Sequence, residues 1–231
     1  MFSKYLQNYD FWGHCDTDLI FGDIRSFITD DLLEKYDRIG LEGPFTLYRN
    51  TPRVNSIYKL LGDKYISDVF ENQSIYAIDE WGLNQNGTSN YWLKNLRESL
   101  WCDMVFDNIE PYYYALMSTR VRRFSPGEKK VFFSFVKGKL YRYGLLNNRI
   151  NKTETLFVHL QKRKITIRTS VESTFSIVPP GQFVAYIEHT TPFSIMWKIR
   201  GGIIGALYTR LRNKIHKVLR IQQYSNTVLI E

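Results

Sequence analysis

Two carboxylates separated by one residue are the strongest chemical feature of the sequence. Asp16 and Asp18 stand in an apolar run that begins at Phe11 and closes at Gly22. Side chains i and i+2 of a strand face the same side, so a strand here would aim both carboxylates at one point. Two such charges repel each other and are costly to desolvate unless a cation lies between them. The pair is therefore a candidate site for Mg²⁺ or Mn²⁺, which suit carboxylate oxygens.

An Asp-x-Asp tripeptide on its own is a weak pattern, because acidic residues also form solvated turns and cap helices. The apolar neighbours Trp12, Leu19, Ile20 and Phe21 would bury much of the segment. They add support to the cation site, and the solvated turn stays open.

The residues around the pair resemble a known family. The run 9–23 is similar to the Asp-x-Asp region of bacterial glycosyltransferases with the GT-A (nucleotide-diphospho-sugar transferase) fold, and more narrowly to a poorly characterised polysaccharide-biosynthesis group. Three further blocks, 43–50, 79–82 and 157–164, match in the expected order. The resemblance extends over residues 1–170 and is more specific than one tripeptide.

The resemblance implies a role for each matching position on the donor side. Asp16 and Asp18 would hold a divalent cation, Mn²⁺ or Mg²⁺, and Asp16 would also reach the donor ribose. His159 would be the third metal ligand, and a neutral imidazole suits Mn²⁺. Lys162 would contact the diphosphate, so that the cation and the lysine together neutralise the departing nucleotide. From the residue pattern alone, a structural histidine at the end of a strand is the favoured interpretation of His159.

On the acceptor side, the resemblance places Asp79, Glu80 and Trp81. A carboxylate there would deprotonate the attacking hydroxyl in an inverting reaction or orient it in a retaining one. Trp81 would stack on a sugar ring, and Arg49 would donate a hydrogen bond to the acceptor. A surface acidic pair beside a half-buried tryptophan, and a purely structural role for residues 45–50, remain open.

The elements that must position these residues form a mixed α/β sheet. Strands are expected near 11–15, 38–43, 131–136, 139–143, 155–159 and 164–169, and helices over 24–36, 55–61 and 90–100, after the last turns of a helix at 1–9. GT-A enzymes place nucleotide-binding βα units before the Asp-x-Asp strand, but only 15 residues precede Asp16. One βαβ unit needs roughly 30 residues. The resemblance thus implies a GT-A-like core that is truncated at its N-terminus or read from a start codon too far downstream, and weak activity of this chain alone.

Positive charge is concentrated at the C-terminus. The net charge is +8, yet residues 190–230 hold seven Lys/Arg and no acidic residue. Leu207, Leu211 and Ile215 recur at helical spacing, which predicts an amphipathic helix with basic flanks. Such a helix suits an anionic membrane surface, although it could also dock on its own domain. Because the rest of the chain is nearly neutral, nucleic-acid binding is not expected.

These observations predict two domains, a catalytic domain at 1–189 and a basic amphipathic tail at 190–231. With two cysteines and neither a signal peptide nor a membrane-spanning run in the sequence, we expect a cytoplasmic protein held peripherally at the membrane. The favoured function is a metal-dependent glycosyltransferase (hexosyltransferase-like) of polysaccharide biosynthesis. It would move a sugar from a nucleotide-sugar donor to a saccharide or lipid-linked acceptor. The alternative is a non-catalytic remnant that binds a membrane or a partner.

Overall fold

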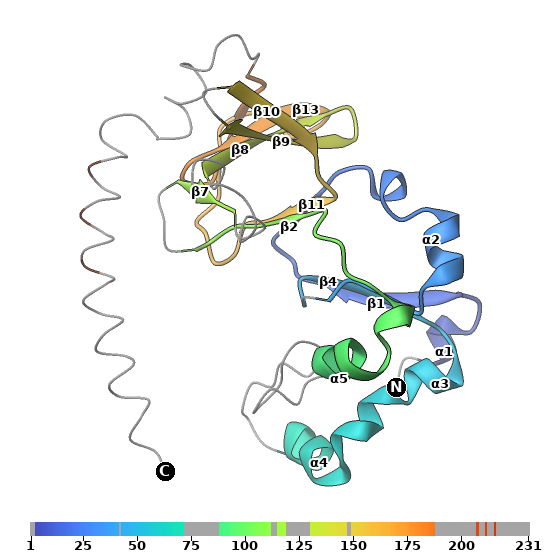
Figure 1. Cartoon of the computed structure of the whole chain (residues 1–231). Coiled ribbons are helices and arrows are strands. Elements are labelled where there is room, and N and C mark those ends of the chain that lie inside the picture. Colours follow the sequence, from blue (N-terminus) through green and yellow to red (C-terminus); the bar gives the residue numbers. More distant parts are fainter. Residues whose placement is uncertain are drawn as a thin grey trace. The chain divides into compact units, whose positions relative to one another are not determined.

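Figure 1 shows the computed structural model of the chain. The structure describes residues 3–41, 43–71, 88–111, 115–118, 130–146 and 149–187, together with Leu207, Leu211 and Ile215. The chain divides into two compact units, which comprise Met1–Leu19 with Ile28–Asp103, and Ile20–Phe27 with Met104–Glu231. The predicted boundary at residue 189 lies at the edge of the described residues and stays a prediction.

The first unit is built on a small mixed sheet in the order β1-β4-β3-β5. The strands are β1 (Phe11–Cys15), β4 (Phe45–Arg49), β3 (Arg38–Ile39) and β5 (Leu100–Trp101), and only the pairing of β3 with β5 is parallel. Its described helices are α1 (Ser3–Leu6), α2 (Asp30–Lys35), α3 (Pro52–Asn55), α4 (Asp63–Glu71), α5 (Thr88–Asn95) and the 3₁₀ turns η2 (Ile57–Leu61) and η4 (Arg97–Ser99). Tyr48, Val54, Ile57, Trp92 and Leu100 form the core.

The second unit contains two sheets. One has the order β10-β9-β8-β13-β14-β12, with β7 also paired to β8, and the other has the order β2-β11-β6. The strands of the larger sheet are β7 (Leu116–Met117), β8 (Lys130–Val136), β9 (Lys139–Leu146), β10 (Arg149–Glu154), β12 (Thr166–Ile167), β13 (Thr174–Val178) and β14 (Gln182–Ala185). The smaller sheet consists of β2 (Leu19–Phe21), β11 (Phe157–His159) and β6 (Asp107–Asn108). A 3₁₀ turn, η1 (Ile24–Ser26), follows β2.

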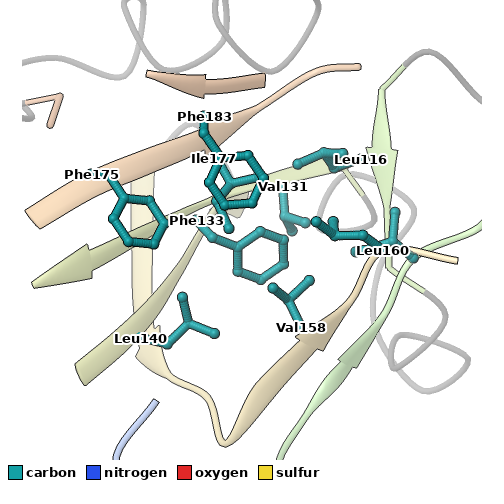
Figure 2. Close-up of a cluster of buried hydrophobic side chains, with 10 residues drawn as sticks. Leu116, Val131, Phe133, Leu140, Val158, Leu160, Phe175, Ile177 and Phe183 are labelled. Carbon is teal, nitrogen blue, oxygen red and sulfur yellow. The ribbon is translucent and has the colours of Figure 1, made fainter. Parts of the chain in front are cut away.

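The core of the second unit joins its two sheets. Phe133, Leu140, Phe175 and Ile177 come from the larger sheet and pack in one buried cluster with Val158 of β11 (Figure 2). Each of these side chains is less than 5 % exposed. Burying a Val, Ile, Leu or Phe side chain contributes about 1.5–3 kcal/mol, so this cluster anchors β11 firmly.

Several expected elements are confirmed. The predicted hairpin is β8 and β9, joined by Lys137 and Gly138, which both have positive φ (49° and 86°). A two-residue turn with positive φ at both positions matches the right-handed twist of the strands. The strands expected over 155–159 and 164–169 are the shorter β11 and β12. The coarse prediction of an α/β fold with a mixed sheet is correct, and most of the described elements are strands.

The expected single helix over 24–36 is wrong. The structure has η1 over Ile24–Ser26 and then a new helix, α2, which begins after Thr29. The Thr29 hydroxyl oxygen accepts a hydrogen bond from the Leu32 backbone N–H at 3.3 Å and so caps the new helix. The helix expected over 55–61 is the 3₁₀ helix η2 (Ile57–Leu61), and the helix expected over 90–100 ends earlier, because α5 stops at Asn95.

No helix within the described residues has the length and apolar character needed to cross a bilayer.

Candidate metal centre

Asp16 and Asp18 lie in the turn between β1 and β2, not on a strand as the alternation of side chains predicts. β1 ends at Cys15 and β2 begins at Leu19. The backbone N–H of Asp16 still donates to the carbonyl of Pro44 at 2.9 Å, so the chain leaves the first sheet only after this residue. The turn, rather than the pleat of a strand, therefore sets the directions of the two carboxylates.

Two glycines fix the path of the chain on either side of this turn. A Cβ atom on Gly13 would lie 2.2 Å from the carbonyl oxygen of Thr46 on the paired strand β4. A Cβ atom on Gly22 would lie 2.8 Å from the backbone nitrogen of Leu140 and 2.9 Å from the Thr155 carbonyl. Backbone approaches this close exclude any other side chain, so both glycines of the run 9–23 have a structural reason.

His159 ends β11, the central strand of the small sheet. β11 pairs in parallel with β6, with Val158 opposite Asp107 and His159 opposite Asn108. The His159 carbonyl accepts from the Ile109 N–H at 3.0 Å, and the His159 residue is 5 % exposed. On the other side, β11 neighbours β2, and the Gly22 N–H donates to the Leu156 carbonyl at 2.8 Å. Asp18 directly precedes β2. Because β2 and β11 are neighbours in the small sheet, Asp18 comes close to the strand that carries His159, although the two residues are far apart in the sequence.

A buried charge pair supports β6 behind this strand. The Asp107 carboxylate is fully buried and accepts hydrogen bonds from Arg142 Nε at 3.1 Å, Ser118 Oγ at 2.6 Å and Thr155 Oγ1 at 3.0 Å. Arg142 is on β9 and is itself 5 % exposed. A buried carboxylate is tolerated only when it is paired and hydrogen-bonded in this way. The sequence analysis missed this group, because nothing in the residue order marks Asp107 as buried.

The structure brings Asp16, Asp18 and His159 together. Each offers one possible ligand atom, a carboxylate oxygen or an imidazole nitrogen, and these atoms all lie within 4.8 Å of one another. Asp16 is exposed, Asp18 is partly buried and His159 is buried, so the cluster is open on one side. These are the three residues that the sequence groups as metal ligands, and their role as ligands stays a prediction.

The donor set fits a divalent cation. Two ligands of one ion at bond lengths of about 2.1 Å are at most about 4.2 Å apart, so small side-chain rotations would close the cluster. Carboxylates suit Mg²⁺ and Mn²⁺, whereas imidazole suits the transition metals, so the mixed set favours Mn²⁺. Three protein ligands leave positions for water or substrate oxygens.

Lys162 lies in a tight turn that follows His159. The Arg163 N–H donates to the Leu160 carbonyl at 3.1 Å, and Lys162 has a φ of +49° and an exposed side chain. Two contacts hold this turn: Gln161 Nε2 donates to Asn108 Oδ1 at 2.6 Å, and the Arg163 guanidinium donates to the carbonyls of Glu110, Ala115 and Pro180. The ammonium of Lys162 is thus carried by a fixed backbone while the side chain reaches solvent.

Charged side chains also meet where β2 ends. The Ser26 hydroxyl donates to Asp23 at 2.6 Å and lowers the pKa of that carboxyl. Lys139 Nζ donates to both carboxylate oxygens of Glu154 at 3.2 Å, and this hydrogen bond raises the pKa of Lys139. The positive charge of Lys139 also lowers the pKa of Asp23, so the residue that caps η1 interacts electrostatically with the β9–β10 hairpin.

Arg49 has structural partners. Its Nε donates to Asp37 Oδ1 at 2.8 Å, and its Nη2 donates to the carbonyls of Leu33, Glu34 and Tyr36 at the end of α2. A cation at this position also interacts favourably with the negative end of the helix dipole. The predicted contact of Arg49 with an acceptor remains a prediction. Asp79, Glu80 and Trp81 lie outside the described residues, so their expected roles also stay predictions.

Taken together, the described residues define a mixed α/β protein with an Asp-Asp-His cluster at the edge of a small sheet. The chain belongs to a family of unknown function, DUF6625, which it matches over residues 1–186. Comparison with curated proteins and with solved structures gives no match.

Proposed function

We propose that this protein is a metal-dependent glycosyltransferase with a GT-A-like core. It would transfer a sugar from a nucleotide-sugar donor to a saccharide or lipid-linked acceptor in polysaccharide biosynthesis. The observation that carries the proposal is the gathering of Asp16, Asp18 and His159 within 4.8 Å. The resemblance of the four sequence blocks to glycosyltransferases supports the same assignment.

The chemistry assigned to each residue follows from the charge of the donor. A divalent cation held by Asp16, Asp18 and His159 would supply Lewis-acid stabilisation of the diphosphate leaving group. Asp16, the most exposed of the three, would also accept a hydrogen bond from the donor ribose. Lys162 would place a further positive charge near the diphosphate, since it lies only three positions after His159. A hydroxyl of the acceptor would attack the sugar carbon, and Asp79 or Glu80 would orient or deprotonate it.

The proposal includes attachment to the cytoplasmic face of a membrane. Leu207, Leu211 and Ile215 are helical, and they are 59 %, 63 % and 51 % exposed. Successive positions four residues apart advance by only about 40° around a helix, so the three side chains form one apolar stripe. The seven Lys/Arg between residues 190 and 230 supply the positive charge that anionic lipids attract, at about 1 kcal/mol each near the surface. The same stripe also supports the alternative of a non-catalytic membrane-binding module.

Cation binding and turnover test the two parts of the catalytic proposal. Titration of the full chain with Mn²⁺, followed by electron paramagnetic resonance of the free ion, should show one site that Asp18→Asn weakens at least tenfold, since even outer-shell changes cost about 10–100-fold. Asp63→Asn, a matched change at an exposed carboxylate on α4, should leave binding unchanged. The same three proteins are then assayed for Mn²⁺-dependent hydrolysis of a panel of nucleotide sugars.

The outcomes separate the candidates. Hydrolysis lost in Asp18→Asn supports a transferase. Cation binding without hydrolysis of any nucleotide sugar supports a non-catalytic module. Equal Mn²⁺ affinity of Asp18→Asn and the unmodified chain refutes the assigned centre. For the membrane, vesicles with anionic lipid should bind the unmodified chain, and Leu207→Glu with Leu211→Glu should abolish this binding, whereas Leu60→Glu, at an exposed site on η2, should not.

A further inference from the structure

The first unit contains a pocket that shares no residue with the candidate metal centre. It is bounded by α2 on one side and by η4, β5 and the residues after β5 on the other, and its volume is about 330 Å³. Side chains that reach it include Asp31, Lys35, Tyr36, Arg97, Trp101 and Asp103. The volume lies at the small end of the range for ligand pockets, about 300–1,000 Å³, which suits a ligand of one or two rings.

Aromatic rings give this pocket flat apolar surface. Trp101 is half-buried on β5, and its indole N–H donates to Asp103 Oδ2 at 3.1 Å. This bond fixes the edge of the indole and holds the carboxylate beside it. Tyr36 is also half-buried, and the Lys35 ammonium lies 5.1 Å from the centroid of its ring. An indole held by its edge can stack on the C–H face of a sugar ring without losing side-chain entropy on binding.

Negatively and positively charged side chains line the pocket beside the rings. Asp31 and Asp103 offer acceptors, and Lys35 and Arg97 offer donors. Arg97 is held in place because its Nη1 donates to the Leu100 carbonyl at 3.0 Å. The two negative and two positive charges cancel, so an ionic ligand would meet repulsion as well as attraction. A neutral molecule with several hydroxyls can donate to the carboxylates and accept from the cations at once.

We propose that this pocket binds an uncharged saccharide of one or two rings, stacked on Trp101 and held through Asp103 and Arg97. The inference goes beyond the proposed glycosyltransferase activity and does not require it. A saccharide can bind here in the absence of a cation. If the protein both transfers sugars and binds a saccharide here, the pocket can hold part of a saccharide acceptor.

The two cysteines of the chain provide the assay. Cys102 is half-buried and lines the pocket, whereas Cys15 is exposed and lies on β1. The full chain is alkylated with iodoacetamide in the absence of divalent cations, and peptide mass spectrometry gives the rate at each thiol. The probes are glucose, galactose, mannose, N-acetylglucosamine, maltose, cellobiose and lactose, with glucuronate and sialic acid as charged comparisons. At least one neutral sugar should slow alkylation of Cys102 several-fold while leaving Cys15 unchanged.

Substitutions decide whether such protection comes from the pocket. Trp101→Ala and Asp103→Asn should each remove the protection, and Asp103→Asn keeps the shape of the side chain if the tryptophan variant fails to fold. Asp63→Asn and Asp18→Asn should retain it, and the latter separates this inference from the metal centre. Protection by no neutral sugar, protection that survives Asp103→Asn, or stronger protection by the charged sugars would each overturn the proposal.

Discussion

Arg142 provides a direct test of how the sheet behind His159 is held. Its Nε donates a hydrogen bond to Oδ1 of the buried Asp107 carboxylate at 3.1 Å. The side chains of the two residues are 6 % and 0 % exposed. Arg142→Met keeps most of the apolar stem and removes the charge. Asp107 then keeps the hydroxyl donors Ser118 and Thr155, which contact it at 2.6 and 3.0 Å.

The expected cost follows from these contacts. Breaking a buried ion pair by removing one partner destabilises a protein by about 3–5 kcal/mol, because it leaves an uncompensated charge. The hydroxyl groups of Ser118 and Thr155 still stabilise the carboxylate, since hydrogen bonds to a charged group contribute about 1.5–3 kcal/mol each. We therefore expect a loss near the low end, about 3 kcal/mol. Urea unfolding of the full chain, followed by circular dichroism, measures this loss from the transition midpoint.

Two further variants make the test specific. Arg149→Met removes an exposed arginine of β10 and should cost less than about 0.5 kcal/mol. Combining Asp107→Asn with Arg142→Met removes both charges and should be more stable than Arg142→Met alone. If Arg142→Met unfolds at the same urea concentration as Arg149→Met, the buried pair contributes nothing and the reasoning is refuted.

Two other changes test separate features of the structure. Burial raises the pKa of Tyr143 to about 12, so between pH 10 and 12 the unfolded state loses this proton before the folded state does. Stability should therefore fall by about 3 kcal/mol over this range in urea unfolding, and Tyr143→Phe should lack this part of the loss. Equal alkaline losses in the two proteins would contradict the prediction. Gly13→Ala would place a Cβ atom 2.2 Å from the Thr46 carbonyl oxygen and should lower the free energy of unfolding by about 1–3 kcal/mol. Gly138→Ala, where a Cβ atom meets no neighbour, should show only the cost of its positive φ. A Gly13→Ala protein as stable as the unmodified chain would show that β1 and β4 separate easily.

The candidate metal ligands could be predicted from the sequence because of their chemistry and because of the resemblance. Asp16 and Asp18 are close in sequence, so their proximity required only local geometry. Periodicity could not join His159 to them, and only the resemblance of the block 157–164 grouped it with the two carboxylates. The predicted cause of this proximity was wrong, however, because the two carboxylates lie in a turn between two strands and not at alternate positions of one strand.

Other features had no signal in the order of residues. Asp107 and Arg142 resemble surface residues, and only the pairing of distant strands shows that both are buried. Arg38 is another example, fully buried with its guanidinium donating to the Gly40 carbonyl at 3.0 Å and to Ser89 Oγ at 2.8 Å. The sequence is more informative where one or two residues determine the backbone conformation of a turn or a helix end. The hairpin of β8 and β9 followed from Lys137 and Gly138, whereas the cap at Thr29 that divides the expected helix was overlooked.

The position of β2 beside β11 has a consequence for how the chain assembles during synthesis. Asp18 and His159 are separated by 141 positions in the sequence, which a ribosome covers in about 7–28 s at about 5–20 residues per second. Throughout that interval Leu19, Ile20 and Phe21 have no β11 to pair with. A nascent chain that stops short of residue 157 therefore keeps an apolar strand without its neighbour, and it has the two carboxylates without the imidazole. During this interval β2 offers an unpaired apolar segment to chaperones that hold emerging polypeptides.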